Sequence, residues 1–441
     1  MDQTITLKFE KLINDVSPLL KGNDVDYIHK AFLFAEKSIA LKGNNEQLHS
    51  ILDTAILAVN HLGLAGKAVV SILLYEFAYI HISHENIAVE YGSKVATIIQ
   101  GIKKIQKIDT SKVSLHSENF IRLMLTQVDD VRVILISLAL KLREVRNIND
   151  LPVENREMLC KELESLYAPL AHRLGMYAIK TEMEELSMKF LHNEMYKSIA
   201  KKLAETKANR EAFIKEFILL ISDSLNEMDI PYEVKGRPKS IHSIWNKIKK
   251  GKVEFERIYD LFAIRIILDS PLENEKADCW HAYSIISDIF RPNPNRLRDW
   301  ISAPKPSGYE SLHTTVLGPG GKWVEVQIRS KRMDEIAEKG NAAHWKYKGG
   351  KQSGSDISWL ASIREILENN EEEKLDDASS TRMELYSDEV FIFTPNGDLK
   401  KLSQGATILD FAYEIHSSIG DTCVGGKVNG KIVPIRHELK N

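Results

Sequence analysis

The chain has few cysteines, no long apolar run and almost no net charge, and each of these shortages excludes a class of protein. Its 441 residues include three cysteines, which are far apart and show no Cys-X-X-Cys spacing: Cys160, Cys279 and Cys423. This number excludes a disulfide-based scaffold and is typical of reduced thiols in the cytoplasm. The sequence has no signal peptide and no apolar run of transmembrane length, so we expect a cytoplasmic protein without a membrane partner.

Charge and length set further limits. The chain has 59 Lys and Arg against 62 Asp and Glu, a formal net charge of −3, so nucleic acid would have to bind a local basic patch. With 43% hydrophobic residues the chain can form the cores of two or three domains. The first half is predicted to be helical, because residues 51–59, 131–142 and 158–174 carry apolar residues at three- and four-residue spacing.

A short basic segment in the second half places cations and hydroxyls at the start of a predicted helix. Ser240 is a plausible N-cap, and Ser243 and Lys247 follow it on one helical face. Arg237 and Lys239 precede the helix, whose N–H groups and dipole add to the attraction for anions. The segment therefore predicts a phosphate-binding site, with a solvated basic helix start as the alternative.

Two carboxylates lie at or beside predicted strands. Asp260 precedes the apolar run 261–268, which indicates a strand buried on both faces. Because a lone buried carboxylate is costly, Asp260 either caps a turn in solvent or binds a cation, most naturally Mg²⁺. In the run 322–329, alternation turns Glu325 and Gln327 to the polar face. Two carboxylates facing a cationic helix start are what metal-assisted phosphoryl transfer requires.

The segment 295–315, between these strands, is predicted to be a loop because of its Pro and Gly content. It carries three cations, an aromatic ring and a histidine: Arg296, Arg298, Lys305, Tyr309 and His313. These would serve a second nucleotide, with Tyr309 stacking on a base and the cations holding phosphates. The alternatives are a core or surface tyrosine and a satisfied structural histidine.

Together these segments resemble the synthetase domain of the RelA/SpoT family of alarmone enzymes. The match runs in order through GRPKSIHSIWNKI at 236–248, IYDLFAIRI at 258–266, RLRDWISAPKPSGYESLHTTV at 296–316, VEVQIRS at 324–330 and AEKGNAAHWKYK at 337–348. The resemblance implies a mixed-sheet, nucleotidyltransferase-like domain that uses Mg²⁺. Such a synthetase moves the pyrophosphate group of ATP to the 3′-hydroxyl of GDP or GTP in the stringent response.

The resemblance also implies roles for the matching residues. Those implied for ATP are Arg237 and Arg265 at the adenine and, at the phosphates, Lys239, Ser243 and Lys247. Those implied for catalysis are Asp260 and Glu325, which would hold Mg²⁺, with Glu325 also the candidate base, and His313. Those implied for GDP or GTP are Tyr309, which would stack on guanine, and His313, Arg296, Arg298, Lys305 and Gln327.

Some positions depart from the family pattern or mark a subgroup. Ser307 and Asp334 stand where the family often has Asn and His, which affects the expected contacts to the acceptor nucleotide and leaves the metal pair intact. The Arg-X-Arg-Asp sequence at 296–299 is basic, whereas the same segment is acidic in some monofunctional synthetases. It implies the metal requirement of the basic subgroup.

The first half resembles the family's hydrolase domain, an all-helical HD-type fold that uses Mn²⁺. The stretches YAPLAHRLG at 167–175 and IKTE at 179–182 match the segment that joins this domain to the synthetase. His49 matches the first metal-binding histidine, but the other ligand positions are occupied by Tyr75, Glu76, Tyr79, Ile80, Leu140 and Glu144. Leucine cannot replace a carboxylate as a ligand of Mn²⁺, and tyrosine is a poor replacement for the imidazole of histidine. The hydrolase metal site is therefore expected to be absent. His81, His84 and Glu85 are either a different metal cluster or a solvated helix end.

Beyond residue 348 the composition changes. The Gly- and Ser-rich stretch 349–355 and the acidic run 368–377 are predicted linkers, although the acidic run would also suit an inhibitory segment folded on the basic cleft. Two strand patterns around a Pro-Asn-Gly turn and an amphipathic helix at 408–416 then resemble a TGS domain, a small β-grasp-like module. In ribosome-associated members this domain contacts uncharged tRNA, and His416 matches the histidine that does so. Because such members continue into further domains, we expect a fragment of a longer protein.

The sequence thus predicts a multi-domain α and α+β protein. The predicted parts are an inactive HD-type domain with connecting helices at 1–195, a synthetase domain at 196–350, an acidic linker at 351–385 and an incomplete TGS domain at 386–441. The expected partners are ATP and GDP or GTP, and, for the full-length protein, the ribosome and uncharged tRNA. The competing hypotheses are a non-catalytic nucleotide or tRNA sensor of the same family and an alarmone hydrolase.

Overall fold

A computed structural model provides the fold of this chain. It describes residues 3–20, 22–40, 45–108, 117–251, 255, 258, 261–305, 307–339, 363–364, 367, 389–393, 399–403, 405–415, 417–428 and 431–439. The chain divides into two compact units, Met1–Asn369 and Asn370–Asn441. No helix among the described residues is long and apolar enough to cross a membrane.

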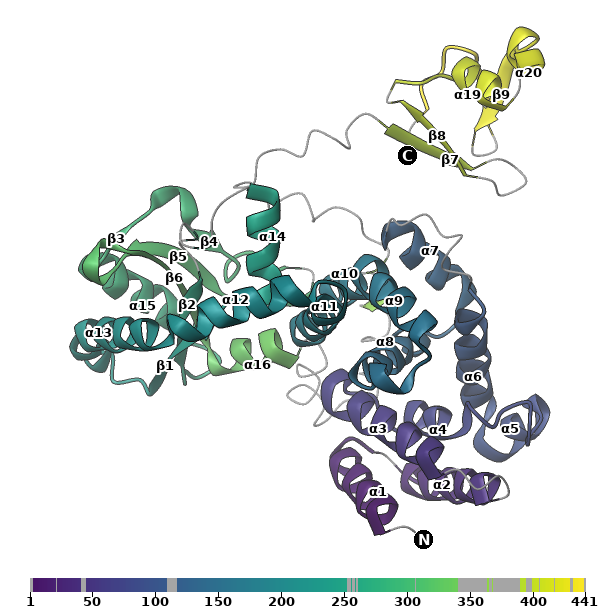
Figure 1. Cartoon of the computed structure of the whole chain (residues 1–441), viewed down its shortest axis with the longest axis horizontal. Helices are drawn as coiled ribbons and strands as arrows, with labels where there is room; N and C mark the ends of the chain where they lie inside the picture. The colour runs from purple at the N-terminus through teal and green to yellow at the C-terminus, as the bar shows by residue number, and fades with distance from the viewer. Residues whose placement is uncertain are drawn as a thin grey trace. The chain divides into compact units, whose positions relative to one another are not determined.

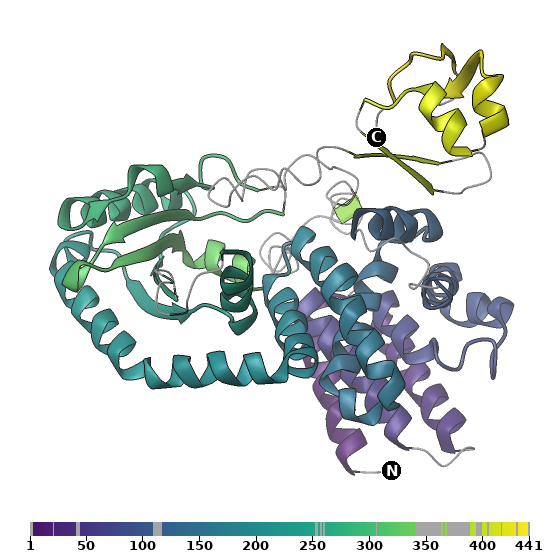
Figure 2. The same cartoon turned by 45° about the horizontal axis from the view of Figure 1, so that its top comes forward.

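The first half of the chain is helical, as its apolar spacing predicts (Figure 1). The helices are α1 Gln3–Val16, α2 Asp24–Ala40, α3 Asn45–Leu62, α4 Lys67–Leu74, α5 His84–Tyr91, α6 Ser93–Gln106, α7 Ser117–Gln127, α8 Arg132–Arg146, α9 Val153–Glu162, α10 Ala168–Arg173 and α11 Tyr177–Leu191. Leu52 of α3, Leu73 of α4 and Leu138 of α8 are fully buried in their common core. Two long helices, α12 Asn193–Glu205 and α13 Lys207–Asn226, follow in teal and lead to the sheet (Figure 2).

A mixed sheet forms the centre of the synthetase-like domain. Its strands are β1 Tyr232–Pro238, β2 Phe262–Leu268, β3 Arg291–Pro292, β4 Arg298–Asp299, β5 Leu312–Leu317 and β6 Trp323–Ser330. The order is β1-β2-β6-β5-β3, with β4 also paired to β5. Strands β2 and β6 are parallel and the other pairs are antiparallel. The predicted mixed-sheet fold is therefore confirmed.

The sheet has one apolar and one polar face because each strand alternates. On the apolar face, Ile264, Val326 and Val316 are fully buried against residues of α13 and of α15, which spans Glu275–Ile289. On the polar face, the register aligns Arg265 with Gln327, Gln327 with His313, and His313 with Arg298. Because directly paired residues point to the same face of a sheet, this row crosses four strands on one side.

The prediction of a loop over 295–315 was wrong at two places. Arg298 and Asp299 form β4, and Leu312 starts β5, which pairs along its whole length with β6. The alternation of Leu312, Thr314 and Val316, all buried, is the strand signal that the Pro and Gly content obscured. The remainder between these strands has no regular structure in its described residues.

The second unit is a small mixed domain. Its elements are β7 Glu389–Phe393, β8 Leu399–Ser403, α19 Ile408–Ile415, α20 Ser417–Asp421, β9 Gly425–Val428 and β10 Lys431–Pro434. Strands β7 and β8 pair antiparallel, as predicted, and so do β9 and β10. Thr407 caps α19, because its Oγ1 accepts the Asp410 N–H at 3.5 Å and its own N–H donates to the Asp410 carboxylate at 2.7 Å. The predicted linker 368–377 and the residue His416 lie outside the described residues.

Candidate active site

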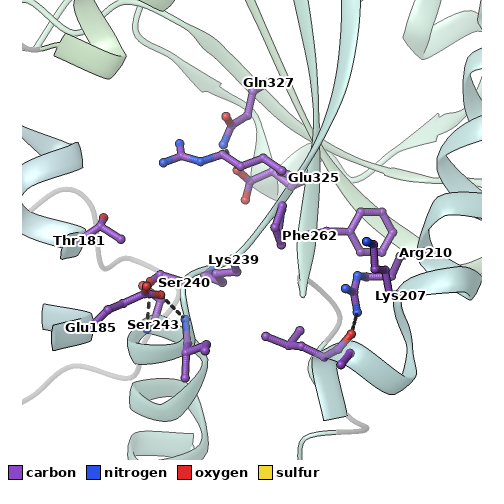
Figure 3. Close-up of a pocket in the computed structure, with 16 residues that line it drawn as sticks. Thr181, Glu185, Lys207, Arg210, Lys239, Ser240, Ser243, Phe262, Glu325 and Gln327 are labelled. Atoms are coloured by element: carbon purple, nitrogen blue, oxygen red, sulfur yellow. Dashed lines mark hydrogen bonds between the residues drawn. The ribbon is translucent and has the colours of Figure 1, made fainter. Parts of the chain in front are cut away.

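A cavity of about 580 Å³ opens between the start of helix α14 (Ile241–Gly251), the polar face of the sheet and the helices that precede it (Figure 3). Five predicted site residues line it: Arg237, Lys239, Ser243, Glu325 and Gln327. Four further polar residues line it that the sequence did not reveal: Thr181 and Glu185 of α11, and Lys207 and Arg210 of α13. Neither Lys247 nor Arg265 is among the described residues that line this cavity.

The start of α14 is held by two acceptors from outside the helical ladder. Ser240 is the N-cap, as predicted, since its Oγ accepts the Ser243 N–H at 3.2 Å. The Ser240 hydroxyl also donates to the Ser243 Oγ at 2.7 Å. Glu185, on α11, accepts the Ile241 N–H through its Oε1 at 2.9 Å. Lys247 lies one turn farther along, on the exposed side of α14.

Glu325 is the acidic residue of the cavity on β6. Its Oε1 accepts a hydrogen bond from Gln327 Nε2 at 2.7 Å and lies 3.4 Å from His313 Nδ1. Burial alone raises the pKa of Glu325, but the hydrogen bond from His313, the charge that His313 carries when protonated, the hydrogen bond from Gln327 and the charge of Lys239 outweigh burial and bring the pKa to about 2. Glu325 is therefore a carboxylate throughout the neutral range.

His313 connects Glu325 to Tyr309. The hydroxyl of Tyr309 lies 2.7 Å from His313 Nε2. Burial lowers the pKa of His313, against the opposing effect of Glu325, so the imidazole is neutral at neutral pH. A neutral ring with one N–H satisfies both neighbours if Nδ1–H donates to Glu325 and Nε2 accepts from the Tyr309 hydroxyl.

Aromatic rings surround Tyr309. Its ring makes edge-to-face contacts with Tyr177 at 5.6 Å and with Trp300 at 5.8 Å between centroids. The Lys305 ammonium lies 4.5 Å from the centroid of Trp300 and 5.8 Å from that of Tyr309. The predicted acceptor residues Tyr309, His313 and Lys305 are thus brought together. Arg298 is aligned with His313 across the sheet, and Arg296 is exposed at the end of the short 3₁₀ turn Pro294–Arg296.

Arg265 and Arg329 form a buried network with helix α16 (Lys331–Lys339). The Arg265 Nη1 lies 3.0 Å from Asp334 and 2.9 Å from Glu338, and the Arg329 Nε lies 3.0 Å from the same Asp334 oxygen. Arg237 approaches Glu338 at 3.6 Å. The Nη2 groups of Arg265 and Arg329 are buried and have no hydrogen-bond partner within the described part of the chain. Asp334, one of the two departures from the family pattern, is thus the shared counter-ion of two arginines.

The second predicted metal carboxylate, Asp260, lies outside the described residues. Within the described ranges, no group of three or more His, Cys, Asp or Glu side chains is placed to hold a metal ion. Glu325 fits a Mg²⁺ ligand by its chemistry, since it is an ionised oxygen donor in the cavity.

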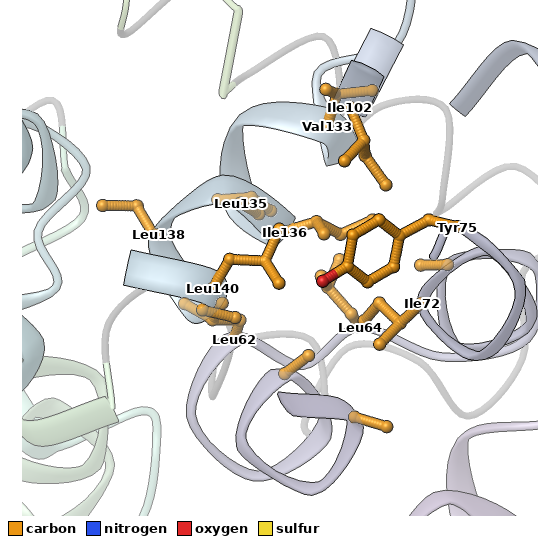
Figure 4. Packing of buried hydrophobic residues seen from close by; sticks show 14 of the residues in the cluster. Leu62, Leu64, Ile72, Tyr75, Ile102, Val133, Leu135, Ile136, Leu138 and Leu140 are labelled. Atoms are coloured by element: carbon orange, nitrogen blue, oxygen red, sulfur yellow. The ribbon is translucent and has the colours of Figure 1, made fainter. Parts of the chain in front are cut away.

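Several positions that match the hydrolase metal ligands carry apolar or hydrogen-bonded side chains. Tyr75 is 5% exposed, and its hydroxyl donates to Glu76 at 2.7 Å. The other Glu76 oxygen accepts from Gln47 Nε2 at 2.6 Å, a partner that the sequence analysis missed. Leu140 is 6% exposed and belongs to the same buried cluster as Tyr75 and Leu64, as Figure 4 shows.

Three sequence families match the chain in order. The family described as "HD domain" matches residues 31–177, that described as "Region found in RelA / SpoT proteins" matches 236–352, and that described as "TGS domain" matches 390–441. The cavity residues Arg237, Lys239, Ser243, Glu325 and Gln327 all fall within the second match.

Curated relatives match across most of the chain. A GTP pyrophosphokinase of Myxococcus xanthus is 37% identical over 95% of this chain and 56% of that protein. A guanosine-3′,5′-bis(diphosphate) 3′-pyrophosphohydrolase of Aquifex aeolicus is 38% identical over 87% of this chain and 55% of that protein. The chain spans little more than half the length of these relatives. Among solved structures, small alarmone synthetase 1 of Bacillus subtilis bound to its product pppGpp is 22% identical over 38% of this chain and 91% of that chain, with a TM-score of 0.26.

Proposed function

The chain belongs to the RelA/SpoT family, and we propose that it transfers the pyrophosphate group of ATP to the 3′-hydroxyl of GDP or GTP. The main support for this proposal is the cavity, which is lined by the ionised Glu325 together with Arg237, Lys239 and Ser243. In the reaction the 3′-oxygen attacks the β-phosphorus of ATP, the bond to the α-phosphate oxygen breaks, and AMP leaves. Such a transfer depends on placing both nucleotides in line and neutralising the phosphate charge.

We assign the donor nucleotide to the α14 side of the cavity. Lys239, Ser243 and, farther along, Lys247 would hold the phosphates at the helix start, where the dipole favours anions. Arg237 and Arg265 would flank the adenine, and their common neighbour Glu338 supports a shared location for the two guanidinium groups.

We assign Mg²⁺ to Glu325 and Asp260. An ion held there would neutralise phosphate oxygens as their charge shifts. A pKa of about 2 suits Glu325 to this role, whereas a base works best with a pKa near the operating pH. We therefore rank the ligand role of Glu325 above its role as proton acceptor.

We assign the acceptor nucleotide to the β5 side. Tyr309 would stack on guanine, with its hydroxyl fixed by His313. Lys305, Arg298 and Arg296 would hold the phosphates, and Gln327 would complete the shell beside Glu325.

We propose that the helical domain, which we place at residues 1–195, does not hydrolyse alarmone, although the Aquifex aeolicus relative carries a hydrolase name. Tyr75 and Leu140 support this proposal because they are packed in the core, and neither supplies the imidazole or carboxylate that Mn²⁺ prefers. The matching positions would then offer Mn²⁺ the imidazole of His49 without the rest of the family's ligand set.

We propose further that synthesis takes place in the cytoplasm and that the TGS domain, placed at residues 386–441, brings the full-length protein to the ribosome and to uncharged tRNA. The match to the TGS family at 390–441 supports this assignment. His416 would make the tRNA contact, and the stretch 351–385 would link the domains.

The test is to incubate the purified chain with labelled ATP, Mg²⁺ and either GDP or GTP, and to separate the products. We expect AMP and the pyrophosphorylated guanine nucleotide in equal amounts. Glu325→Gln should reduce turnover by about 10²- to 10⁴-fold, because Glu325 acts mainly in the transition state. The control is Glu216→Gln, on the exposed side of α13, which should behave as wild type. Near-normal turnover of Glu325→Gln would remove Glu325 from its assigned role.

A further inference from the structure

Glu185 places a carboxylate at the helix start to which the donor phosphates are assigned. It belongs to α11, which packs in the helical domain, yet its side chain lines the same cavity as Lys239 and Ser243. Its Oε1 accepts the N–H of Ile241, the first residue of α14, at 2.9 Å. Figure 3 shows Glu185 beside Ser240 and Ser243.

A carboxylate and a phosphate bind a helix start by the same means. Both accept hydrogen bonds from first-turn N–H groups and both are stabilised by the positive end of the helix dipole. The first turn offers few such donors, and here Ser240 already accepts the Ser243 N–H while Glu185 accepts that of Ile241. An incoming triphosphate also meets the negative charge of Glu185 across the cavity.

We propose that Glu185 is a further residue of the donor site, an internal anion that competes with the phosphates of ATP for the start of α14. The inference rests on the assignment of ATP to this cavity. Glu185 weakens ATP binding while it stays on the Ile241 N–H, and ATP binds tightly only when the carboxylate has withdrawn.

The helix that carries Glu185 also contacts the acceptor side. Tyr177, its first residue, packs edge-to-face on Tyr309 at 5.6 Å. Gly175, two residues before it, has φ +71°, and a Cβ there would lie 2.8 Å from that of Ser307, so Ser307 packs closely against residue 175. One helix thus touches the elements assigned to both nucleotides.

The same helix is anchored to the helical domain. The guanidinium of Arg146 on α8 holds Glu182 with two hydrogen bonds of 2.7 and 2.8 Å. On its other side α11 contacts α14: Glu184, next to Glu185, lies 3.0 Å from Lys180 of the same helix and 3.2 Å from His242 Nδ1 on α14. A shift of α11 with the helical domain that breaks the Glu184–His242 contact would move Glu185 relative to α14, and the position of the helical domain would then set the affinity for ATP.

A purely structural role for Glu185 predicts the opposite sign, which makes the proposal testable. Glu185→Gln keeps an oxygen that accepts the Ile241 N–H but removes the charge. If Glu185 only capped α14, this change would loosen the helix start and weaken ATP binding. If Glu185 competes with ATP, the change lowers the KM for ATP.

The experiment uses the full chain. It measures the KM for ATP at saturating GDP, and it titrates α,β-methylene-ATP, which cannot donate its pyrophosphate group, by calorimetry. For Glu185→Gln we expect both the KM and the analogue's Kd to fall by about twofold to tenfold, the range of a charge at a helix terminus, with kcat little changed. The gain should shrink at high salt because screening weakens the repulsion. Glu185→Ser, which also removes the charge, should change both constants in the same direction.

The control is Glu194→Gln, an exposed carboxylate near the start of α12, which should leave both constants unchanged. An unchanged or raised Kd for the analogue in both Glu185 variants would overturn the proposal. If no variant forms product, the proposed function fails, but the analogue titration still decides whether Glu185 competes at this site.

Discussion

Glu325, His313 and Tyr309 form a hydrogen-bonded row that leads from the cavity into the fold. Each donor in the row meets an acceptor if His313 is neutral, with Nδ1–H toward Glu325 and Nε2 toward the Tyr309 hydroxyl. This arrangement keeps a charged carboxylate in a partly buried place, because the hydrogen bonds to it offset the cost of burial.

The row makes stability depend on pH in a definite direction. Burial lowers the pKa of His313 below its ordinary value of 6.5, so in the window just below 6.5 the unfolded chain binds more protons than the folded chain. Stability therefore rises with pH toward 6.5 and is lost as the pH falls through the folded pKa. We predict that urea unfolding between about pH 5 and about pH 7 gives a smaller pH slope for His313→Gln than for wild type. Equal slopes would contradict the assignment.

Single residues were predictable where their partners are close in sequence. The N-cap role of Ser240 follows from a rule that spans three residues, and the orientation of Glu325 follows from strand alternation. Glu185 and Gln47 could not be found in this way, because their partners Ile241 and Glu76 lie 56 and 29 residues away. No local spacing encodes such contacts, and the chemistry of a lone Glu or Gln on a helix gives no signal.

At the scale of elements, Asp334 connects helix α16 to strands β2 and β6 of the sheet through ion pairs. Its carboxylate is shared by Arg265 of β2 and Arg329 of β6, which are 6% and 1% exposed. Removing the Asp334 charge leaves Arg329 without this counter-ion, whereas Arg265 keeps Glu338 at 2.9 Å, and an uncompensated buried charge is the costly step.

We predict that Asp334→Asn lowers the free energy of unfolding by about 3–5 kcal/mol, the range measured when a buried pair is broken. Urea denaturation followed by circular dichroism measures the change. Glu335→Gln, one residue along the same helix, is the control and should change stability by less than about 0.5 kcal/mol. A loss in Asp334→Asn no larger than in the control would show that the two arginines do not depend on Asp334.

Elements were predictable to different degrees. The helices of the first half and strand β6 follow from periodic apolar spacing, and strand β2 follows from an unbroken apolar run, so the fold class was predicted correctly. Strands β4 and β5 were missed inside a segment whose Pro and Gly content suggested a loop. They exist because β5 pairs with β6 and β4 pairs with β5, which satisfies backbone groups of both strands, an energy that the segment's own composition does not show.

At the scale of the molecule, we propose a synthetase site joined to a helical domain that does not hydrolyse alarmone. The helical domain retains a continuous apolar core, in which Tyr75 and Leu140 are buried. The Tyr75 hydroxyl donates a hydrogen bond to one carboxylate oxygen of Glu76, and the Gln47 side chain donates to the other. On this account the domain acts on synthesis through α11 and carries out no second reaction.

The most direct test is a single time course that follows both reactions in the intact chain. Labelled product is first formed from ATP and GDP with Mg²⁺, ATP is then exhausted, Mn²⁺ is added, and the amount of product is followed for hours. The account predicts that product accumulates and then stays constant, with Mn²⁺ and without it. Absence of product in the first phase would contradict the synthetase assignment. Loss of product with release of pyrophosphate after Mn²⁺ is added, abolished by His49→Ala, would show that the helical domain is a working hydrolase.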